Sequence, residues 1–231
     1  MNALPDFGAW DAVRAGLDDR GLHLVPRLLN RAACTDLAAG YGTDQFRSTV
    51  VMARHGFGRG EYKYYRYPLP PLVAEFRSRL YERLVPIANA WQETLGAPIR
   101  YPDRHEEFLA RCRSAGQTRP TPLILRYGPG DYNCLHQDVY GENIFPLQVA
   151  VLLSSSLDFS GGEFVLTEQR PRRQSRAQVV PLGQGDAVIF PVRDRPVRGA
   201  RGFYRAQHRH GVSEIRSGQR HTLGIIFHDA A

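Results

Sequence analysis

The second half of the chain alternates apolar and polar residues in short segments. From residue 121 onward the segments end at turns rich in glycine and proline, and no helical period separates them. Side chains of a strand alternate between its two faces, so this period of two predicts strands with one face toward a core. The pattern favours an all-β barrel or sandwich. The predicted strands are 123–127, a short one carrying His136 and Asp138, 146–154, 163–167, 179–182, 187–191, 203–210 and 221–228.

The first half combines helical periods with shorter strand patterns. Apolar residues three or four positions apart predict helices, and capping residues mark their ends. Pro86 should kink the longest of these helices. The expected helices are 9–20, one capped by Asn30 and ended by Gly40, one from the Pro70–Pro71 pair to about 95, and one from a capping box at 103–106 to about 114.

A hairpin is predicted between the first two helical regions and the third. Residues 47–54 and 61–67 read as strands, and the glycine-rich segment 55–60 joins them. Arg54, His55 and Arg59 lie in or beside this loop. It is therefore expected either to fold over a substrate or to be an exposed loop without function.

Length and composition predict one domain. The chain has 231 residues, of which 42% are hydrophobic, which suits a single sizeable core. We expect a supporting region of helices and a hairpin over 1–120 and a β core over 121–231. No run of 18 apolar residues and no signal peptide is read, and the three cysteines suit reduced thiols, so a cytoplasmic protein is expected. Cys134, two residues before His136, is expected to be either a packed core thiol or a neighbour of the site, and the core is favoured.

Three residues predict a metal site. His136 and Asp138 share a strand face, because residues two apart point to the same side. His210, far along the chain, is the candidate for the third ligand, and His208 is the rival on the same face. Two imidazoles and one carboxylate on one side of a metal are typical of non-haem Fe(II) oxygenases. A His-x-Asp pair alone is weak evidence, because such pairs also occur as ordinary surface hydrogen-bonding pairs.

Arg220 adds an anion-binding group to this set. It lies ten residues after His210 and shares a strand face with Thr222. A planar guanidinium binds a carboxylate through two hydrogen bonds. Taken alone, Arg220 would be interpreted as a solvated strand residue. It counts as evidence for a site because of its order and spacing relative to His136, Asp138 and His210.

The order His-x-Asp, His, Arg resembles that of the 2-oxoglutarate/Fe(II) dioxygenases. The segment from Tyr127 to Asp138 is similar to the motif of prolyl hydroxylases and AlkB-type demethylases. Over nearly its whole length the chain resembles a bacterial family of these oxygenases predicted to demethylate damaged DNA bases oxidatively. The segments that carry this resemblance are 46–48, 52–64, 116–123, 136–141, 145–148, 161–172, 209–213 and 221–229.

The resemblance implies a fold and a set of roles. The fold would be α+β and mainly β: a double-stranded β-helix (a cupin-like jelly roll) with the N-terminal helices packed on its major sheet. His136, Asp138 and His210 would hold Fe(II), and O2 would be the oxidant. The cosubstrate 2-oxoglutarate would be bound by Arg220 and Thr222, with Tyr127 donating to it.

The positive charge is concentrated in one block. Residues 169–209 hold ten arginines and two aspartates, a local net charge of +8 in a chain of net charge +7. Such a block is a candidate for phosphate contacts, and solvated loops are the alternative interpretation. Tyr140, just after the ligand pair, could stack on a base. The substrate-binding candidates are Tyr140, Arg170, Arg172, Arg173 and Arg176.

Three functions follow from these observations. The first is an iron oxygenase that demethylates alkylated nucleic-acid bases and so acts in DNA repair. The second is the same chemistry on a protein prolyl residue or a small molecule, which the single arginine near the C-terminus favours because AlkB-type enzymes use a pair. The third is a non-catalytic basic binding module. No membrane partner is expected, and oligomeric state is not predicted.

Overall fold

The fold is built from two antiparallel sheets, described by a computed structural model over residues 10–231. The seven-stranded sheet has the order β1 (His23–Val25), β11 (Ala187–Pro191), β7 (Leu147–Leu152), β15 (Arg220–Ile226), β5 (Leu123–Tyr127), β4 (Glu61–Tyr65) and β2 (Phe46–Val51). The six-stranded sheet has the order β10 (Arg176–Val180), β9 (Phe164–Gln169), β13 (Gly202–Val212), β6 (Tyr132–His136) and β3 (Gly58–Arg59), with β12 (Asp194–Gly199) also paired to β13. A separate pair joins β14 (Ile215–Gly218) to β8 (Phe159–Gly161).

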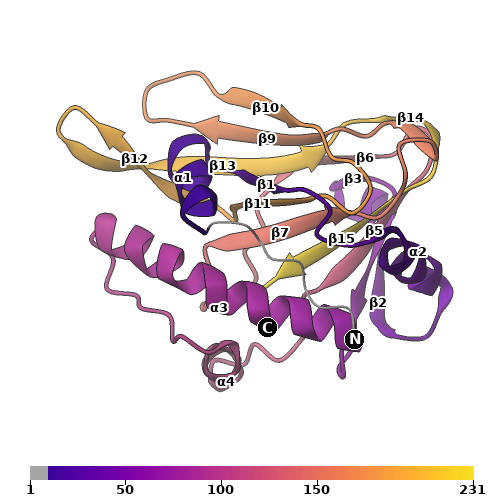
Figure 1. Ribbon diagram of the computed structural model, residues 1–231, viewed down its shortest axis with the longest axis horizontal. Coiled ribbons are helices and arrows are strands. Elements are labelled where there is room, and N and C mark those ends of the chain that lie inside the picture. The colour runs from indigo at the N-terminus through magenta and orange to yellow at the C-terminus, as the bar shows by residue number, and fades with distance from the viewer. Residues whose placement is uncertain (1–9) are drawn as a thin grey trace.

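Helices cover one face of the seven-stranded sheet. They are α1 (Trp10–Arg20), α2 (Arg31–Ala39), α3 (Pro71–Thr94) and α4 (His105–Ser114). Figure 1 shows α3 running along the strands of this sheet, with α4 beneath it. Apolar residues of these helices, such as Phe76 and Leu80, form one core with Val149, Ile225 and their neighbours on the sheet. The prediction of a mainly β protein with N-terminal helices against the larger sheet is confirmed.

The two faces of the seven-stranded sheet explain its sequence pattern. Every residue of β7 and of β11 is buried, because helices cover one face and the six-stranded sheet lies toward the other. Leu147, Val149 and Val151 belong to the helix-side core, so the alternate residues of β7 face the space between the sheets. In β9, by contrast, buried and partly exposed residues alternate, as expected for a strand with one solvated face.

Several predicted boundaries need correction. The third helix begins at Pro71, and Asn30 caps α2 by accepting a hydrogen bond from the Ala33 amide at 2.8 Å, both as predicted. The prediction of a capping box at 103–106 is wrong, because α4 begins at His105 and no side chain caps it. The first hairpin strand ends at Val51, where a 3₁₀ turn over Met52–His55 replaces its predicted end. The strand β12 was not predicted, and residue 9 and the N-terminal residues read for a signal peptide lie outside the described residues.

The three cysteines were expected to be reduced thiols, and no membrane-spanning helix was expected. Cys34 and Cys112 are buried and free, which suits the predicted reduced thiols. Cys134 is free but exposed, so its interpretation as a core thiol is wrong. Within residues 10–231, no helix has the length and apolar character needed to cross a membrane.

A buried ion pair fastens α3 to the C-terminal segment. Arg77 is 1% exposed and its Nη2 lies 2.8 Å from Asp229 Oδ1, whose side chain has no exposed surface. Arg77 also donates through Nε to the Ile226 carbonyl at 2.9 Å and through Nη1 to the Tyr67 hydroxyl at 2.9 Å. Every group of this pair is therefore satisfied, which is the condition for burying charge. The pair holds the end of β15 against the helix layer.

Candidate active site

Two neighbouring strands of the six-stranded sheet bring the two candidate histidines together. His136 ends β6, and it lies directly opposite His210 on β13 in the antiparallel register. The ring centroids are 4.2 Å apart. A residue pair on facing positions of adjacent strands has its side chains on the same face, which here points between the sheets. The pairing of β6 with β13 therefore brings His136 and His210 into contact, although they are far apart in the chain.

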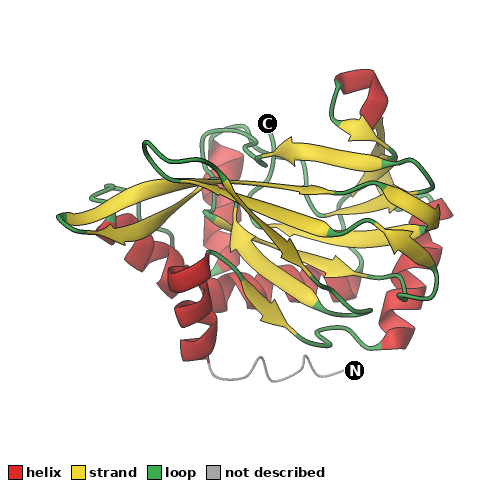
Figure 2. Ribbon diagram, turned by 90° about the horizontal axis from the view of Figure 1, so that it is seen from above, coloured by secondary structure: helices red, strands yellow, loops and turns green. Residues whose placement is uncertain are grey.

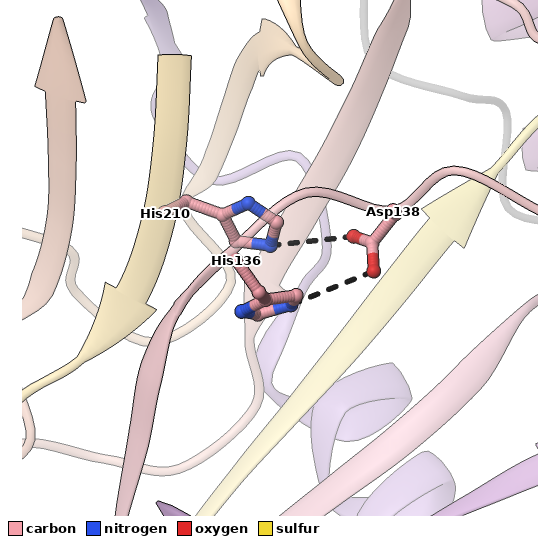
Figure 3. Close-up of side chains that lie close together, drawn as sticks. All are labelled: His136, Asp138 and His210. Atoms are coloured by element: carbon pink, nitrogen blue, oxygen red, sulfur yellow. Dashed lines mark ion pairs between the residues drawn. The ribbon is translucent and has the colours of Figure 1, made fainter. Parts of the chain in front are cut away.

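Asp138 completes the cluster from the loop that follows β6. Its Oδ1 lies 3.5 Å from His136 Nε2, and its Oδ2 lies 3.3 Å from His210 Nε2. Figure 3 shows the two rings and the carboxylate converging, with one candidate ligand atom from each residue within 4.8 Å of the others. His208, the rival third ligand, lies outside this cluster: its Nε2 is 3.4 Å from Glu168 Oε2. The structure therefore brings together the three residues predicted first.

The donor set and its surroundings fit a divalent transition metal. Two imidazole nitrogens and a carboxylate on one side are the donors that iron takes in facial sites. The Nδ1 of His136 bonds the Cys134 carbonyl at 2.8 Å, so its Nε2 is left to face the cluster. Such outer hydrogen bonds fix the tautomer and orientation of metal-binding histidines.

The electrostatics of the cluster favour an ionised Asp138 and a neutral His210. Burial alone would lower the pKa of His136, but the facing Asp138 carboxylate outweighs that effect and raises it. Burial alone would raise the pKa of Asp138, but the facing His136 and His210 imidazoles hold it well below its usual range. Burial lowers the pKa of His210, and the neighbouring His136 lowers it further. An ionised carboxylate beside a neutral imidazole is the form in which these side chains coordinate a metal ion.

Arg220 lies buried at the start of β15, opposite Tyr127 on β5. It is 1% exposed, and its Nη1 donates to Thr222 Oγ1 at 2.6 Å. Its Nε and the Tyr127 hydroxyl are buried without a hydrogen-bond partner. Burial lowers the pKa of Arg220 to about 10, so the guanidinium is still charged at neutral pH. No carboxylate of residues 10–231 forms an ion pair with it, and an unpaired buried charge is costly, which points to an anionic ligand.

One cavity joins the metal cluster to Arg220. Its volume is about 330 Å³, and its walls are mainly aliphatic and aromatic. The walls include all three candidate metal ligands, Arg220, Thr222 and Tyr127, together with Tyr62, Tyr64, Tyr140, Gln148, Phe190 and Cys134. Gly56 and Phe57 of the glycine-rich loop also line it. That this loop closes over a substrate stays a prediction.

Comparison with known proteins places the chain in a family. The model of the family Oxygenase-NA, described as an oxygenase catalysing oxidative methylation of damaged DNA, matches residues 60–230. The chain belongs to this family. Uncharacterized proteins from two strains of Mycobacterium tuberculosis are each 51% identical to it over 165 residues, which is 71% of this chain and 71% of theirs.

The fold of this Oxygenase-NA protein is that of the 2-oxoglutarate/Fe(II) oxygenases. A 2OG-Fe(II) oxygenase family oxidoreductase from Burkholderia pseudomallei superposes with a TM-score of 0.58 at 16% identity, covering 97% of this chain and 93% of that one. A prolyl-4-hydroxylase from Pseudomonas putida superposes with a TM-score of 0.56 at 13% identity, covering 94% and 96%. Family and fold together confirm the predicted superfamily of oxygenases.

The loop that carries Asp138 is held from outside the two sheets. Gln117 is 1% exposed, and its Nε2 donates to the carbonyls of Tyr140 and Asn143 at 3.0 and 3.1 Å. Its Oε1 accepts from the Asn143 amide at 2.7 Å. The chain leaves the sheet after His136, and hydrogen bonds from the Gln117 side chain hold the backbone of the loop that follows. Gln117 lies in the segment 116–123 that carries the family resemblance, but no local pattern predicted these contacts.

Tyr140 has a role at the carboxylate that the sequence did not predict. Its hydroxyl donates to Asp138 Oδ1 at 2.7 Å, while its ring lines the cavity. We expect Tyr140→Phe to weaken Fe(II) binding by about 10- to 100-fold, because outer hydrogen bonds orient metal-binding carboxylates. Anaerobic metal titration measures this, with Tyr132→Phe, an exposed tyrosine of β6, as the control. Equal affinity in Tyr140→Phe and the wild-type protein would leave the ring with only its predicted stacking role.

The predicted phosphate-binding arginines differ in their surroundings. Arg170 is engaged by Glu168, with Nε 2.6 Å from Oε1. Arg195, counted in the same basic block, is 1% exposed and donates to Glu168 Oε2 at 3.0 Å through Nε. Arg172, Arg173 and Arg176 are exposed around the β9–β10 turn. The block is therefore less available to a polyanion than the count of arginines suggested.

Proposed function

We infer that this protein is a 2-oxoglutarate- and Fe(II)-dependent oxygenase that demethylates alkylated bases of nucleic acid. The observation that carries the inference is the shared cavity, in which a His-Asp-His cluster lies with a buried arginine that has no carboxylate partner among the described residues. The family description, which concerns damaged DNA, supports the choice of substrate.

The proposed framework is a double-stranded β-helix. Its support is the way the chain crosses between the two sheets: β5, β7, β11 and β15 lie in one, β6, β9, β10 and β13 in the other, and only the β9–β10 hairpin joins consecutive strands of this set within one sheet. Eight antiparallel strands wound in this way make a jelly roll. In this framework His136 and His210 extend from one sheet, and Arg220 from the other.

Each side chain has a defined part in the proposed reaction. His136, Asp138 and His210 would hold Fe(II), which supplies oxygen activation coupled to oxidative decarboxylation of 2-oxoglutarate to succinate and carbon dioxide. Arg220 would bind the far carboxylate of the cosubstrate, with Thr222 fixing the guanidinium and the Tyr127 hydroxyl free to donate. The apolar walls exclude water, which strengthens these charged contacts. One oxygen atom enters an N-methyl C–H bond, and the resulting N-hydroxymethyl group releases formaldehyde.

The exposed arginines suit a polyanionic substrate. Arg172, Arg173 and Arg176 form no ion pair with any described carboxylate, and Arg198 and Arg201 are likewise exposed in the neighbouring β12–β13 hairpin. Figure 1 places the turns of both hairpins at the same end of the six-stranded sheet, and Figure 2 shows that β12 and β13 extend beyond the rest of the fold. Clustered guanidinium groups without partners attract phosphate groups.

The reaction is tested by measuring two products. With Fe(II), O2 and 2-oxoglutarate, we expect the wild-type protein to release formaldehyde from N-methylated single-stranded oligonucleotides in step with succinate. His136→Ala should release neither. Succinate without formaldehyde on every nucleic acid, together with a gain of one oxygen atom in proline-containing peptides, would contradict the nucleic-acid substrate and favour protein hydroxylation. Absence of succinate under all conditions would favour the binding module.

The basic surface predicts the salt dependence of binding. Replacing Arg172, Arg173 and Arg176 together by glutamine should reduce the slope of log K against log salt by about 2 for single strands, because each phosphate contact contributes about 0.7. Fluorescence anisotropy across a range of NaCl concentrations measures the slope. Arg14→Gln/Arg79→Gln, which removes two exposed arginines of the helix layer, is the control. An unchanged slope in the triple variant would assign these arginines to solvent.

A further inference from the structure

Gln148 is a buried polar residue without a partner in the centre of the seven-stranded sheet. It lies on β7 opposite Phe190 of β11 and Ile226 of β15, and it is 2% exposed. Its amide nitrogen has no hydrogen-bond partner within residues 10–231, and the residue lines the cavity. Buried amides in proteins are nearly always paired, so an unpaired one that faces a cavity indicates a donor kept for a ligand.

The neighbours of Gln148 place it between the metal cluster and an aromatic wall. On one side, the Phe190 ring lies 4.8 Å from the His210 ring. On the other side, Ile226 packs with Tyr64, which is in edge contact with Tyr62 at 5.3 Å and Tyr140 at 6.4 Å. The three tyrosines and the Gln148 amide line the same cavity, so a flat ring bound among the tyrosines would share that space with the amide.

The position of Gln148 is separated along the sheet from the proposed cosubstrate anchor. Gln148 pairs with Ile226, whereas the Arg220 guanidinium is held at Thr222, four residues earlier on β15. Four residues of a strand span about 13 Å. The four C–C bonds of 2-oxoglutarate, at about 1.5 Å each, give it a carbon skeleton no longer than about 6 Å. The Cα separation between Thr222 and the partner of Gln148 is thus about twice the length of the diacid, which favours separate positions for the cosubstrate anchor and for a ligand of Gln148.

We propose that Gln148 is a specificity-determining residue that donates a hydrogen bond to a ring carbonyl of an uncharged, flat substrate base. The inference rests on the proposed function and narrows it to lesions such as 3-methylthymine, in which carbonyls flank the methylated nitrogen. Apart from the metal cluster and Arg220, no charged side chain of residues 10–231 lines the cavity, so its walls suit an uncharged ring. The amide of Gln148 supplies the selectivity, because a site built around a buried donor rejects ligands that lack the acceptor.

The test compares Gln148→Leu with the wild-type protein in three measurements. Anaerobic fluorescence anisotropy, with Fe(II) and 2-oxoglutarate present, gives the affinity for single-stranded oligonucleotides carrying 3-methylthymine or 1-methyladenine, which has no ring carbonyl. We expect Gln148→Leu to lose at least tenfold affinity for 3-methylthymine and less than twofold for 1-methyladenine. Its affinity for 2-oxoglutarate should change less than twofold, and its melting temperature should not fall, because an unpaired amide is removed.

Each contrary result has a distinct meaning. A tenfold loss of 2-oxoglutarate affinity in Gln148→Leu would assign the amide to the cosubstrate and overturn the proposal. A lower melting temperature with unchanged oligonucleotide binding would make Gln148 structural. If the wild-type protein binds neither lesion better than unmodified DNA, the proposed function fails as well. If it binds 3-methylthymine and Gln148→Leu binds it equally, only the role of Gln148 fails. Gln178→Leu, on β10 outside the cavity, is the matched control.

Discussion

Arg220→Leu is expected to weaken the binding of 2-oxoglutarate by about 100- to 4,000-fold. The variant lacks the guanidinium, so the cosubstrate carboxylate loses its charge-assisted partner. Breaking a buried ion pair costs about 3–5 kcal/mol, and each 1.4 kcal/mol changes the dissociation constant tenfold. Burial lowers the pKa of Arg220 only to about 10, so the wild-type guanidinium is charged throughout the neutral range. Arg220→Lys should retain part of the affinity, because lysine keeps the charge and loses the planar pair of donors.

Isothermal titration of 2-oxoglutarate into the anaerobic Fe(II) protein measures this prediction. Arg216→Leu is the matched control, because Arg216 is also near the start of β15 but its side chain is 71% exposed and pairs with Glu163 at the surface. Its affinity for 2-oxoglutarate should match that of the wild-type protein. If Arg220→Leu bound 2-oxoglutarate as well as Arg216→Leu does, the guanidinium would have no part in holding the cosubstrate.

Asp229→Ala is expected to lower the free energy of unfolding by about 3–5 kcal/mol, because it leaves the Arg77 charge buried and unpaired. Single domains are stable by only about 5–15 kcal/mol, so this variant should be at the margin of folding at 37 °C. Urea unfolding followed by circular dichroism measures the loss. Asp44→Ala removes the partner of an ion pair whose aspartate is 99% exposed, and it should leave the unfolding midpoint unchanged. Equal midpoints for the two variants would show that the buried pair contributes no more than the exposed one.

Short-range patterns in the sequence predicted most of the elements. The period of two located β5, β7, β9, β11, β13 and β15, and the cap at Asn30 located α2. These features depend on residues a few positions apart, which is the range over which side-chain periodicity operates. The ends of strands, and short strands such as β12 and β3, were harder to predict from the sequence, because pairing with distant strands decides where a strand begins and ends.

The position of Asp138 was predicted correctly, but the structural reason for it differs from the one expected. His136 and Asp138 would share a strand face only if one strand ran through both residues. β6 ends at His136, and the carboxylate reaches the cluster from a loop fixed by Gln117 and by the Tyr140 hydroxyl. These contacts join positions that no local pattern relates.

The basic block shows a second limit of sequence reasoning. Counting arginines over 169–209 gave a strong positive charge, but the count cannot register pairing with residues outside the block. Glu168, one residue before it, engages both Arg170 and Arg195, and Arg195 is buried through contacts that also reach the Asp18 carbonyl at 2.6 Å. The pairing of β9, β12 and β13 brings these residues together, so it follows from the fold.

The central claim is that three side chains, His136, Asp138 and His210, hold one iron beside the cosubstrate-binding arginine. Anaerobic titration with Fe(II), followed by equilibrium dialysis and metal analysis, tests it most directly. The account predicts one iron per chain in the wild-type protein and in His221→Gln, and no stoichiometric binding in Asp138→Ala or His210→Ala when both variants remain folded. One iron per chain retained by folded His210→Ala would contradict it.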